Sequence, residues 1–323
     1  MDRDDGPART VTAIAGGIGA GKFLRGLARV VPGPDLTVIV NVADDVDIHG
    51  LHVSPDPDSV TYWLGDVFDR GRGWGRREET FRTTEELRAF GAEQAWFNLG
   101  DLDLATHVFR TDLLRRGATP SAVMARVASR FGVTARLLPV TDDPVETRIV
   151  CADTTTGTEI DLHFQEYWVR RRAADPVKEV RYHGAAEARP APGVLEAIAA
   201  ADAIVLCPSN PVVSIGPILA VPGVREALVA RRERVVGISG IVGGAPVAGM
   251  ADKLMPAAGI EVSATGVARH HADLLGGWLV DDADRNAVPV IESLGIRAAA
   301  TDTIMTDDDR ATAVASAALA LLP

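Results

Sequence analysis

Cysteine is scarce in this 323-residue chain, which holds only Cys151 and Cys207. The two residues are far apart and neither belongs to a CxxC pair, so we expect neither a disulfide framework nor a thiolate zinc site. Basic residues are also in deficit, because 33 Lys and Arg stand against 44 Asp and Glu and leave a net charge of −11. A nucleic-acid partner is therefore not expected, since affinity of that kind comes largely from neutralised phosphates.

Long apolar runs are missing as well. No stretch approaches the roughly 20 residues that a helix needs to cross a bilayer. The first residues, Met1 to Gly6, are acidic and lack the basic start and apolar run of a signal peptide. We therefore expect a cytoplasmic protein without membrane contact. Its length allows one large or two ordinary domains with a substantial core.

What is present is an alternation of short apolar runs and helix-like segments. Residues 11–15 and 36–42 are apolar runs that flank a segment with helical spacing, which predicts a β-α-β unit. The pattern returns near the end of the chain, with helices expected at 194–201, 217–230 and 267–275 and strands at 203–207, 234–242 and 278–280. We predict an α/β fold with a Rossmann-like, doubly wound and mostly parallel sheet.

The middle of the chain does not alternate in this way. Residues 62–129 are helix-like, whereas 146–151 and 159–164 flank a turn-rich segment and indicate an antiparallel hairpin. We predict a nucleotide-binding core formed by residues 1–61 and 190–323. The inserted helical and β-hairpin subdomain is expected at 62–189, where it would cover the site.

A glycine-rich loop follows the first expected strand, with Gly16, Gly17, Gly19 and Gly21 before Lys22. Glycines let a ligand approach the backbone, and the start of a helix offers unpaired N–H groups to an anion, so the loop indicates phosphate binding. Two known motifs are incomplete here. Phe23 stands where a P-loop needs Ser or Thr, and Lys22 stands at the third glycine of a dinucleotide motif. A tight turn without a ligand is the alternative.

Carboxylates and histidines follow the second expected strand. Asp44 and Asp45 should lie beside the glycine loop, because ligands of open α/β sheets bind outside the carboxyl ends of strands. Mg²⁺ between these acids and a phosphate would explain them. His49 and His52 as transition-metal ligands, or the two acids as caps, are the alternatives. Asp58 or Ser59 is expected either to cap a following helix or to bind a polar substrate.

Two later segments add polar groups. Asn98 begins a stretch rich in Gly and Asp that indicates the entry to a helix, and capping is one explanation for its acids. Ser209 and Asn210 follow a buried strand at the expected edge of the sheet, where they could contact phosphate or base. A plain Pro-rich turn is the alternative for the second segment.

Together these segments resemble the 2-phospho-L-lactate transferase family, which completes the precursor of the deazaflavin coenzyme F-420. The residues that carry the resemblance are GGIGAGKFLRGLA (16–28), NVADD (41–45), SPDPDSVTYWL (54–64), LGDLDLATH (99–107), PVTDDPVETRI (139–149), HFQEYWV (163–169) and PSNPVVSIGPIL (208–219). The Ala-, Arg- and Asp-rich composition is similar to that of the actinobacterial phosphoenolpyruvate transferase branch.

The resemblance implies a site and a reaction. A three-carbon acid linked through phosphate to GMP would pass to a hydroxyl of the deazaflavin Fo, with release of GMP and with Mg²⁺ present. Gly16 to Lys22, Ser209 and Asn210 would face the guanosine diphosphate moiety, Asp45 would hold the metal, and Asp58 and Asn98 would contact Fo. Family members carry a basic residue at the position of Asn98. A homodimer is also implied.

The mechanism expected from this set is in-line displacement at phosphorus, with Asp44 or Asp58 orienting or deprotonating the attacking hydroxyl. Two other functions compete with it. Nucleotide-sugar-binding regulators of the gluconeogenesis-factor type share the glycine loop and VADD, but they continue into a Gly/Ser-rich stretch where this chain continues into residues 46–58. A P-loop ATPase is the other, and Phe23 argues against it.

Overall fold

The computed structural model describes residues 10–323, so the acidic start at Met1 to Gly6 lies outside the described residues. Within this range a central sheet has seven parallel strands in the order β14-β13-β10-β9-β1-β2-β5. The strands are β1 (Val11–Ala15), β2 (Leu36–Val40), β5 (Arg136–Pro139), β9 (Ala203–Leu206), β10 (Val235–Ile238), β13 (Gly277–Asp281) and β14 (Arg297–Thr301). The predicted Rossmann-like, mostly parallel α/β fold is confirmed.

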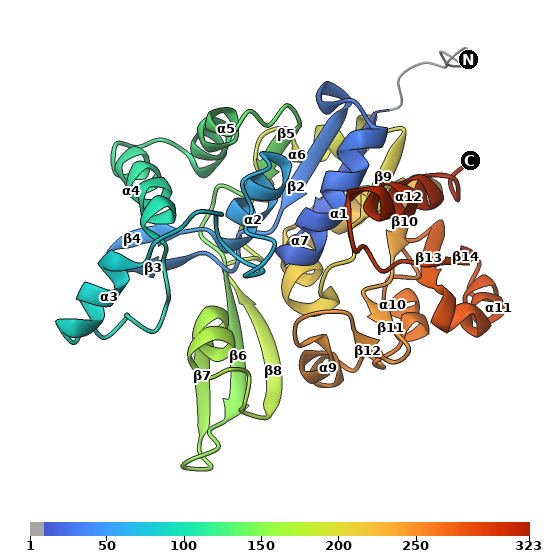
Figure 1. Cartoon of the computed structure of the whole chain (residues 1–323). Coiled ribbons are helices and arrows are strands. Elements are labelled where there is room, and N and C mark those ends of the chain that lie inside the picture. The colour runs from blue at the N-terminus through green and yellow to red at the C-terminus, as the bar shows by residue number, and fades with distance from the viewer. Residues whose placement is uncertain (1–9) are drawn as a thin grey trace.

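Helices cover both faces of this sheet (Figure 1). One face packs against α1 (Gly17–Val30), α5 (Pro120–Arg130) and α12 (Asp308–Leu319). The other packs against α6 (Val194–Ala200), α7 (Gly216–Ala220), α8 (Val224–Ala230), α10 (Ala264–His270) and α11 (Val288–Glu292). Because β1 and β9 are buried at every residue, their sequences are continuous apolar runs rather than alternating ones.

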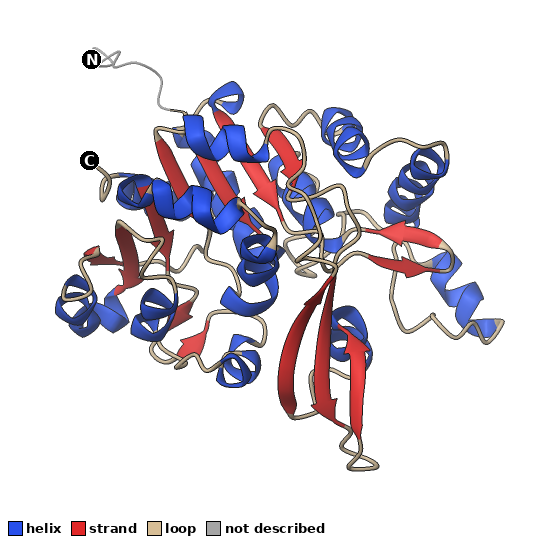
Figure 2. Ribbon diagram, turned by 180° about the vertical axis from the view of Figure 1, so that it is seen from behind, coloured by secondary structure: helices blue, strands red, loops and turns tan. Residues whose placement is uncertain are grey.

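The remaining elements form two projections from the sheet. The hairpin β3 (Val46–Ile48) and β4 (Leu51–Val53) is followed by α2 (Pro55–Leu64), α3 (Arg82–Ala89) and α4 (Asp101–Arg115). A separate antiparallel sheet, β7-β6-β8, extends away from the body (Figure 2). Its strands are β6 (Glu146–Ala152), β7 (Glu159–His163) and β8 (Val177–His183), so the predicted hairpin is confirmed and gains a third strand. The short elements β11 (Ile241–Val242), β12 (Ala245–Pro246) and α9 (Ala251–Leu254) precede α10.

The predicted limits of the inserted subdomain need correction. Residues 62–189 include β5, which pairs in parallel with β2 as the edge strand of the central sheet. They also include α5, whose Met124 and Ala128 pack in the core beneath that sheet. The chain therefore returns to the core between the two projections. A four-residue strand after a glycine turn carries little periodicity, which is why the pattern did not reveal it.

The sheet topology places the site. The chain passes from β1 to β2 on one side, whereas β9 lies on the other side of β1, so the connections diverge at β1. Crevices outside the carboxyl ends of strands at such a switch point are where open α/β sheets bind ligands. Within residues 10–323 no single helix is long and apolar enough to cross a membrane. One sharply bent pair, Pro211–Ala220 with Val224–Ala230, meets the length and composition criterion only when its two parts are combined.

Candidate active site at the carboxyl ends of β1, β2 and β9

The glycine loop lies where β1 passes into α1, with Gly16 as the residue before the helix. Gly17 has a φ of +74°, a conformation that side chains rarely adopt. A Cβ atom at Gly19 would lie 2.6 Å from the carbonyl oxygen of Pro208, so the loop and the segment after β9 are in direct contact. Gly21 faces Trp63 of α2, and Lys22 makes no ion pair with any residue in the described range. The loop thus combines close backbone packing with an unpaired cation.

The contact between Gly19 and Pro208 makes a testable prediction. Gly19→Ala should lower the free energy of unfolding by about 1–3 kcal/mol, because the new methyl group meets a backbone oxygen that cannot rotate away. Ile18→Ala is the matched control, since Ile18 is 44% exposed on the same helical turn and should change stability little. Urea unfolding of both variants measures the difference. An unchanged midpoint for Gly19→Ala would show that the two segments are not in contact.

Ser209 and Asn210 follow β9 and differ in their availability. The Asn210 side chain accepts the backbone N–H groups of Val212 and Val213, at 2.9 and 3.3 Å, and so caps the helical turn at Pro211–Ile215. The Ser209 hydroxyl is buried and has no hydrogen-bond partner. Of the two residues predicted to contact a ligand, Ser209 therefore has a side-chain hydroxyl that is not already hydrogen-bonded.

Asp56, which sequence reasoning did not select as a site residue, joins the glycine loop to the carboxylates. Its carboxylate accepts the backbone N–H of Gly17 and the Asn41 side-chain amide, the latter at 3.0 Å. Burial raises the pKa of Asp56 to about 7, while these two hydrogen bonds oppose the shift. The first amide of α1 is therefore already occupied by an acid, and an anionic ligand must use the amides that follow it.

Asp44 and Asp45 lie just beyond β2, as predicted. Asp44 is buried, and burial together with the nearby Asp56 holds its pKa well above the usual value. Asp45 Oδ2 accepts hydrogen bonds from the Ser54 hydroxyl at 2.8 Å and pairs with His52 Nε2 at 3.1 Å. One oxygen of each acid, Asp44 Oδ1 and Asp45 Oδ1, is buried without a hydrogen-bond partner.

These two unpartnered oxygens fit a divalent cation. Mg²⁺ takes carboxylate oxygens, phosphate oxygens and water as ligands, and buried carboxylates without a partner are costly unless a cation compensates them. The alternative of a transition-metal site at His49 and His52 gains no support, because His52 is already engaged with Asp45 and with Asp47, at 3.2 Å from Nδ1. The predicted magnesium ligand Asp45 is thus chemically suited to that role.

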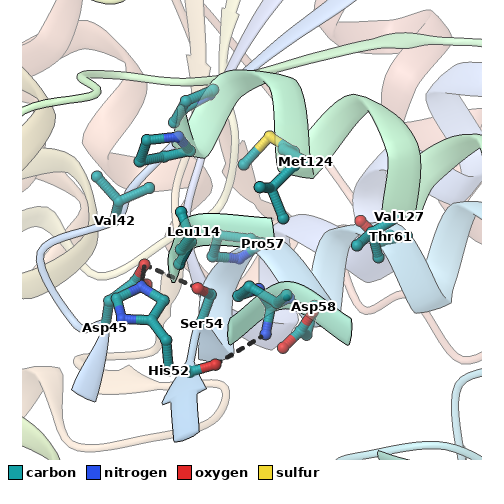
Figure 3. Close-up of a pocket in the computed structure, with 14 residues that line it drawn as sticks. Val42, Asp45, His52, Ser54, Pro57, Asp58, Thr61, Leu114, Met124 and Val127 are labelled. Atoms are coloured by element: carbon teal, nitrogen blue, oxygen red, sulfur yellow. Dashed lines mark hydrogen bonds and ion pairs between the residues drawn. The ribbon is translucent and has the colours of Figure 1, made fainter. Parts of the chain in front are cut away.

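A pocket opens beside Asp45 (Figure 3). Polar side chains line one part of it, and they come from the loop after β2 and from β4, α2 and α4. Apolar side chains from the loop after β2 and from α2, α4, α5 and β5 line the rest. The polar set is Asp45, His52, Ser54, Asp58, Thr61 and Arg110, and the apolar set is Val42, Pro57, Leu114, Pro120, Val123, Met124, Val127 and Pro139. The cavity volume of the pocket, about 30 Å³, admits a single small group such as a hydroxyl rather than a ring system.

Asp58 lies in the first turns of α2 rather than at its cap. The helix begins at Pro55, so the expectation that Asp58 or Ser59 caps it is wrong. The Asp58 carboxylate is buried and forms an ion pair with Arg110 of α4 through Oδ1. Oδ2 is also buried, has no hydrogen-bond partner and lies 3.7 Å from His107 Nδ1. Burial raises the pKa of Asp58, and the charge of Arg110 offsets part of that rise.

Asp58, Asp103 and His107 bring ligand atoms within 4.8 Å of one another, which could suggest a second metal site. Arg110 argues against one, because its guanidinium pairs with Asp58 and contacts His107 Nδ1 at 3.0 Å. A cation placed among these groups would face a fixed positive charge. The cluster is better described as an ion-pair network with its own cation.

Comparison with known proteins identifies the family. A family model described as 2-phospho-L-lactate transferase CofD matches residues 11–315. The chain belongs to the 2-phospho-L-lactate transferase family. It is 51% identical over 312 residues to a phosphoenolpyruvate transferase of Streptomyces griseus subsp. griseus, which covers 96% of this chain and 98% of that protein. It is 42% identical over 325 residues to a phosphoenolpyruvate transferase of Mycolicibacterium smegmatis, with 96% and 98% covered.

Solved structures agree with this fold. Two crystal structures of a UPF0052-family protein from Bacillus halodurans superpose with TM-scores of 0.61 and 0.63, and they cover 96–97% of this chain and 99% of those chains. Their identities of 20% and 18% show the fold alone. Family membership, in contrast, shows that this chain is a transferase.

In this member of the 2-phospho-L-lactate transferase family, Asn98 is not one of the pocket-lining residues. It precedes α4, where neighbouring acids serve as caps: Asp101 accepts the N–H groups of Arg82 and Thr83 at the start of α3, each at 3.1 Å. Asn98 is partly buried and does not line the pocket described above. Its predicted contact with Fo stays a prediction.

Sequence reasoning missed the groups that hold the carboxylates of this transferase. Asn41 and Ser54 each stand inside a segment that had been noticed, NVADD and SPDPD, and only the fold shows which acid each one contacts. Arg110 lies 52 residues from Asp58 and carried no motif. A signal did exist, since Asp103, His107 and Arg110 repeat at helical spacing and therefore share one face of α4.

Proposed function

We propose that this protein transfers a phospho-linked three-carbon acid, phosphoenolpyruvate rather than 2-phospho-L-lactate, from a guanosine diphosphate donor to the deazaflavin Fo. GMP is released, and the product belongs to coenzyme F-420 biosynthesis. The names of the actinobacterial relatives support the choice of acid. The observation that carries the proposal is that Asp44 and Asp45 each keep one buried oxygen without a partner. Asp45 lines the pocket, and Asp44 interacts with Asp56, which binds the N–H of Gly17 in the glycine loop.

The donor side of the site is the glycine loop with the segment after β9. The amides of the first turn of α1 beyond Gly17 have no acceptors within the helix and can receive diphosphate oxygens. Lys22 is free of ion pairs within the described chain and the Ser209 hydroxyl is unpartnered, so both are available to the same ligand. Asp56 fixes the loop through the N–H of Gly17.

Asp45, with Asp44 beside it, would hold Mg²⁺ near the donor phosphates. When bound, the ion supplies positive charge that offsets the negative charge developing on the phosphate oxygens. The protein residues prepare the site for it: His52 and Ser54 hold Asp45 through Oδ2, which leaves Oδ1 as the oxygen for the cation. A cation held by these carboxylates would also explain how an acidic loop can lie beside an anionic donor.

The acceptor side is the pocket. Asp58 in its wall suits a hydroxyl of the Fo side chain, whereas the ring system of Fo would lie outside this small cavity of about 30 Å³. Sequence reasoning left Asp44 and Asp58 open as the group that orients or deprotonates the attacking hydroxyl. Asp58 is the better candidate, because it lines the pocket, whereas Asp44 does not.

A donor panel tests the proposal. Purified protein is mixed with Mg²⁺, Fo and either the enolpyruvyl or the lactyl guanosine diphosphate donor, and the deazaflavin product is weighed by mass spectrometry. We expect a mass gain with the enolpyruvyl donor, with one GMP released per product. The absence of a mass gain with every donor would refute the proposed transferase activity. Binding of a nucleotide sugar without turnover would favour the regulator instead.

A further inference from the structure

Arg110 is a buried arginine that joins the two halves of the proposed site. It is 5% exposed within α4, and its guanidinium contacts groups on three other residues. One nitrogen, Nη2, pairs with Asp58 Oδ1. The other, Nη1, contacts His107 Nδ1 at 3.0 Å and donates to the backbone carbonyl of His52 at 3.4 Å. No carboxylate other than Asp58 pairs with it among the residues described.

The groups around Arg110 keep the guanidinium in one orientation. Because arginine only donates, His107 Nδ1 must accept, and the proton of a neutral His107 is then on Nε2. That nitrogen faces Asp103 Oδ2 at 3.6 Å, and Asp103 Oδ1 accepts the Tyr62 hydroxyl at 2.5 Å. A chain of buried polar groups that do not line the pocket therefore supports Arg110.

Arg110 also reaches the metal carboxylate through β4. The His52 carbonyl accepts from Arg110, and the His52 N–H donates to the Thr111 hydroxyl at 2.8 Å, so α4 holds this residue at both backbone groups. The His52 side chain in turn contacts Asp45 at 3.1 Å. One helix thus sets the positions of Asp58 and, through His52, of Asp45.

We propose that Arg110 is a positioning residue for the acceptor, which holds Asp58 through Oδ1 so that the carboxylate in the pocket wall receives the attacking hydroxyl. The inference rests on the proposed function, in which Asp58 contacts Fo. It goes beyond that function by assigning the alignment of Asp58 to a residue outside every segment that carries the family resemblance. Lysine should not replace it, because an ammonium cannot hold Asp58, His107 and the His52 carbonyl with one planar fork.

Two variants test the proposal in the full-length protein. Arg110→Lys should fold and should raise the KM for Fo about tenfold, because the charge remains but the alignment is lost. Arg110→Ala should lower kcat/KM for Fo about 10²-fold, and added guanidinium should restore part of that loss. Both variants should bind GDP without Mg²⁺ as tightly as the wild type in calorimetric titrations. Arg116→Ala is the matched control, because Arg116 directly follows α4 and its exposed side chain pairs, among the described residues, only with Asp112.

The pH profile supplies a readout that a merely structural residue would not move. Asp58 is faced by Arg110, His107 and Asp103 from α4 and by Tyr62 from its own helix. Removing the positive charge of Arg110 should raise the pKa of Asp58 further. The acid limb of kcat/KM for Fo in Arg110→Ala should then shift to higher pH.

The outcomes separate this inference from the proposed function. If the wild type binds GDP but makes no product from Fo, the proposed function fails. If the wild type is active and Arg110→Lys keeps the wild-type KM for Fo, the positioning role is wrong. An Arg110→Ala variant that loses GDP binding and Fo turnover equally, without rescue by guanidinium, would also overturn it.

Discussion

Asp45→Asn is expected to reduce turnover by at least about 10³-fold while the protein stays folded. The loss of several kcal/mol of metal-assisted stabilisation corresponds to this factor at about 1.4 kcal/mol for each tenfold change in rate. In the wild type, Ser54 and His52 contact Asp45 Oδ2. An asparagine side chain keeps one oxygen for these two partners, but it places a neutral amide where the cation needs a carboxylate. Product formation at saturating Mg²⁺ measures the effect, and thermal unfolding reports the fold.

Asp47→Asn is the matched control for this prediction. Asp47 lies two residues away and also contacts His52, but its side chain is 76% exposed. An exposed ion pair of this kind contributes at most about 1 kcal/mol, so turnover should stay within about fivefold of wild type. Near-normal turnover by Asp45→Asn would show that Asp45 does not hold the metal, whatever the result for Asp47→Asn.

Much of the central sheet could be predicted because its strands are buried on both faces. Residues 11–15 and 203–206 have no room for a polar face, so each is an apolar run that ends where a loop begins. The same principle located the site, since Asp44, Asp45 and Ser209 follow such runs directly. Parallel strands bring those ends to one edge of the sheet, and no knowledge of contacts was needed.

The ion-pair network of Asp58 and the α4 residues could not be predicted in the same way. In α4 several ionisable residues are buried and several apolar residues are exposed, which reverses the usual pattern. Asp103, His107 and Arg110 are buried, whereas Leu102, Val108 and Phe109 are 40%, 54% and 40% exposed. A reading of hydrophobic periodicity places the apolar residues inward and the charged ones in solvent. Ion pairing with Asp58, which is distant in sequence, decides the orientation instead.

The short strands could not be predicted for another reason. The strands of the β3–β4 hairpin have three residues each, and β14 is an Arg-Ala-Ala-Ala-Thr segment with little β propensity. Their pairing depends on neighbours supplied by the fold: β14 lies beside β13, and the hairpin is held through His52 by α4. Such tertiary contacts are absent from a single-sequence pattern.

Mg²⁺ is expected to stabilise the protein strongly at pH 8 and little at pH 5. Asp56, with a native pKa of about 7 against an unfolded value near 3.8, binds its proton more tightly in the folded state. Stability therefore falls as pH rises from about 4 to 7, by about 4 kcal/mol at most for this one group. Asp44, whose pKa is also raised, adds to the same slope. A cation beside these carboxylates favours their charged forms and should cancel much of the loss.

The informative quantity is the difference between melting temperatures with Mg²⁺ and with a chelator at each pH. The melting temperature at a single Mg²⁺ condition also depends on groups whose pKa shifts act in the opposite direction. Burial lowers the pKa of His271 to about 3, so this residue destabilises the fold as pH falls below about 6.5. That contribution is the same with and without the ion and disappears from the difference. Asp56→Asn should reduce the growth of the difference between pH 5 and 8, because one buried carboxylate no longer ionises. Parallel profiles with and without Mg²⁺ would show that no cation binds near these carboxylates.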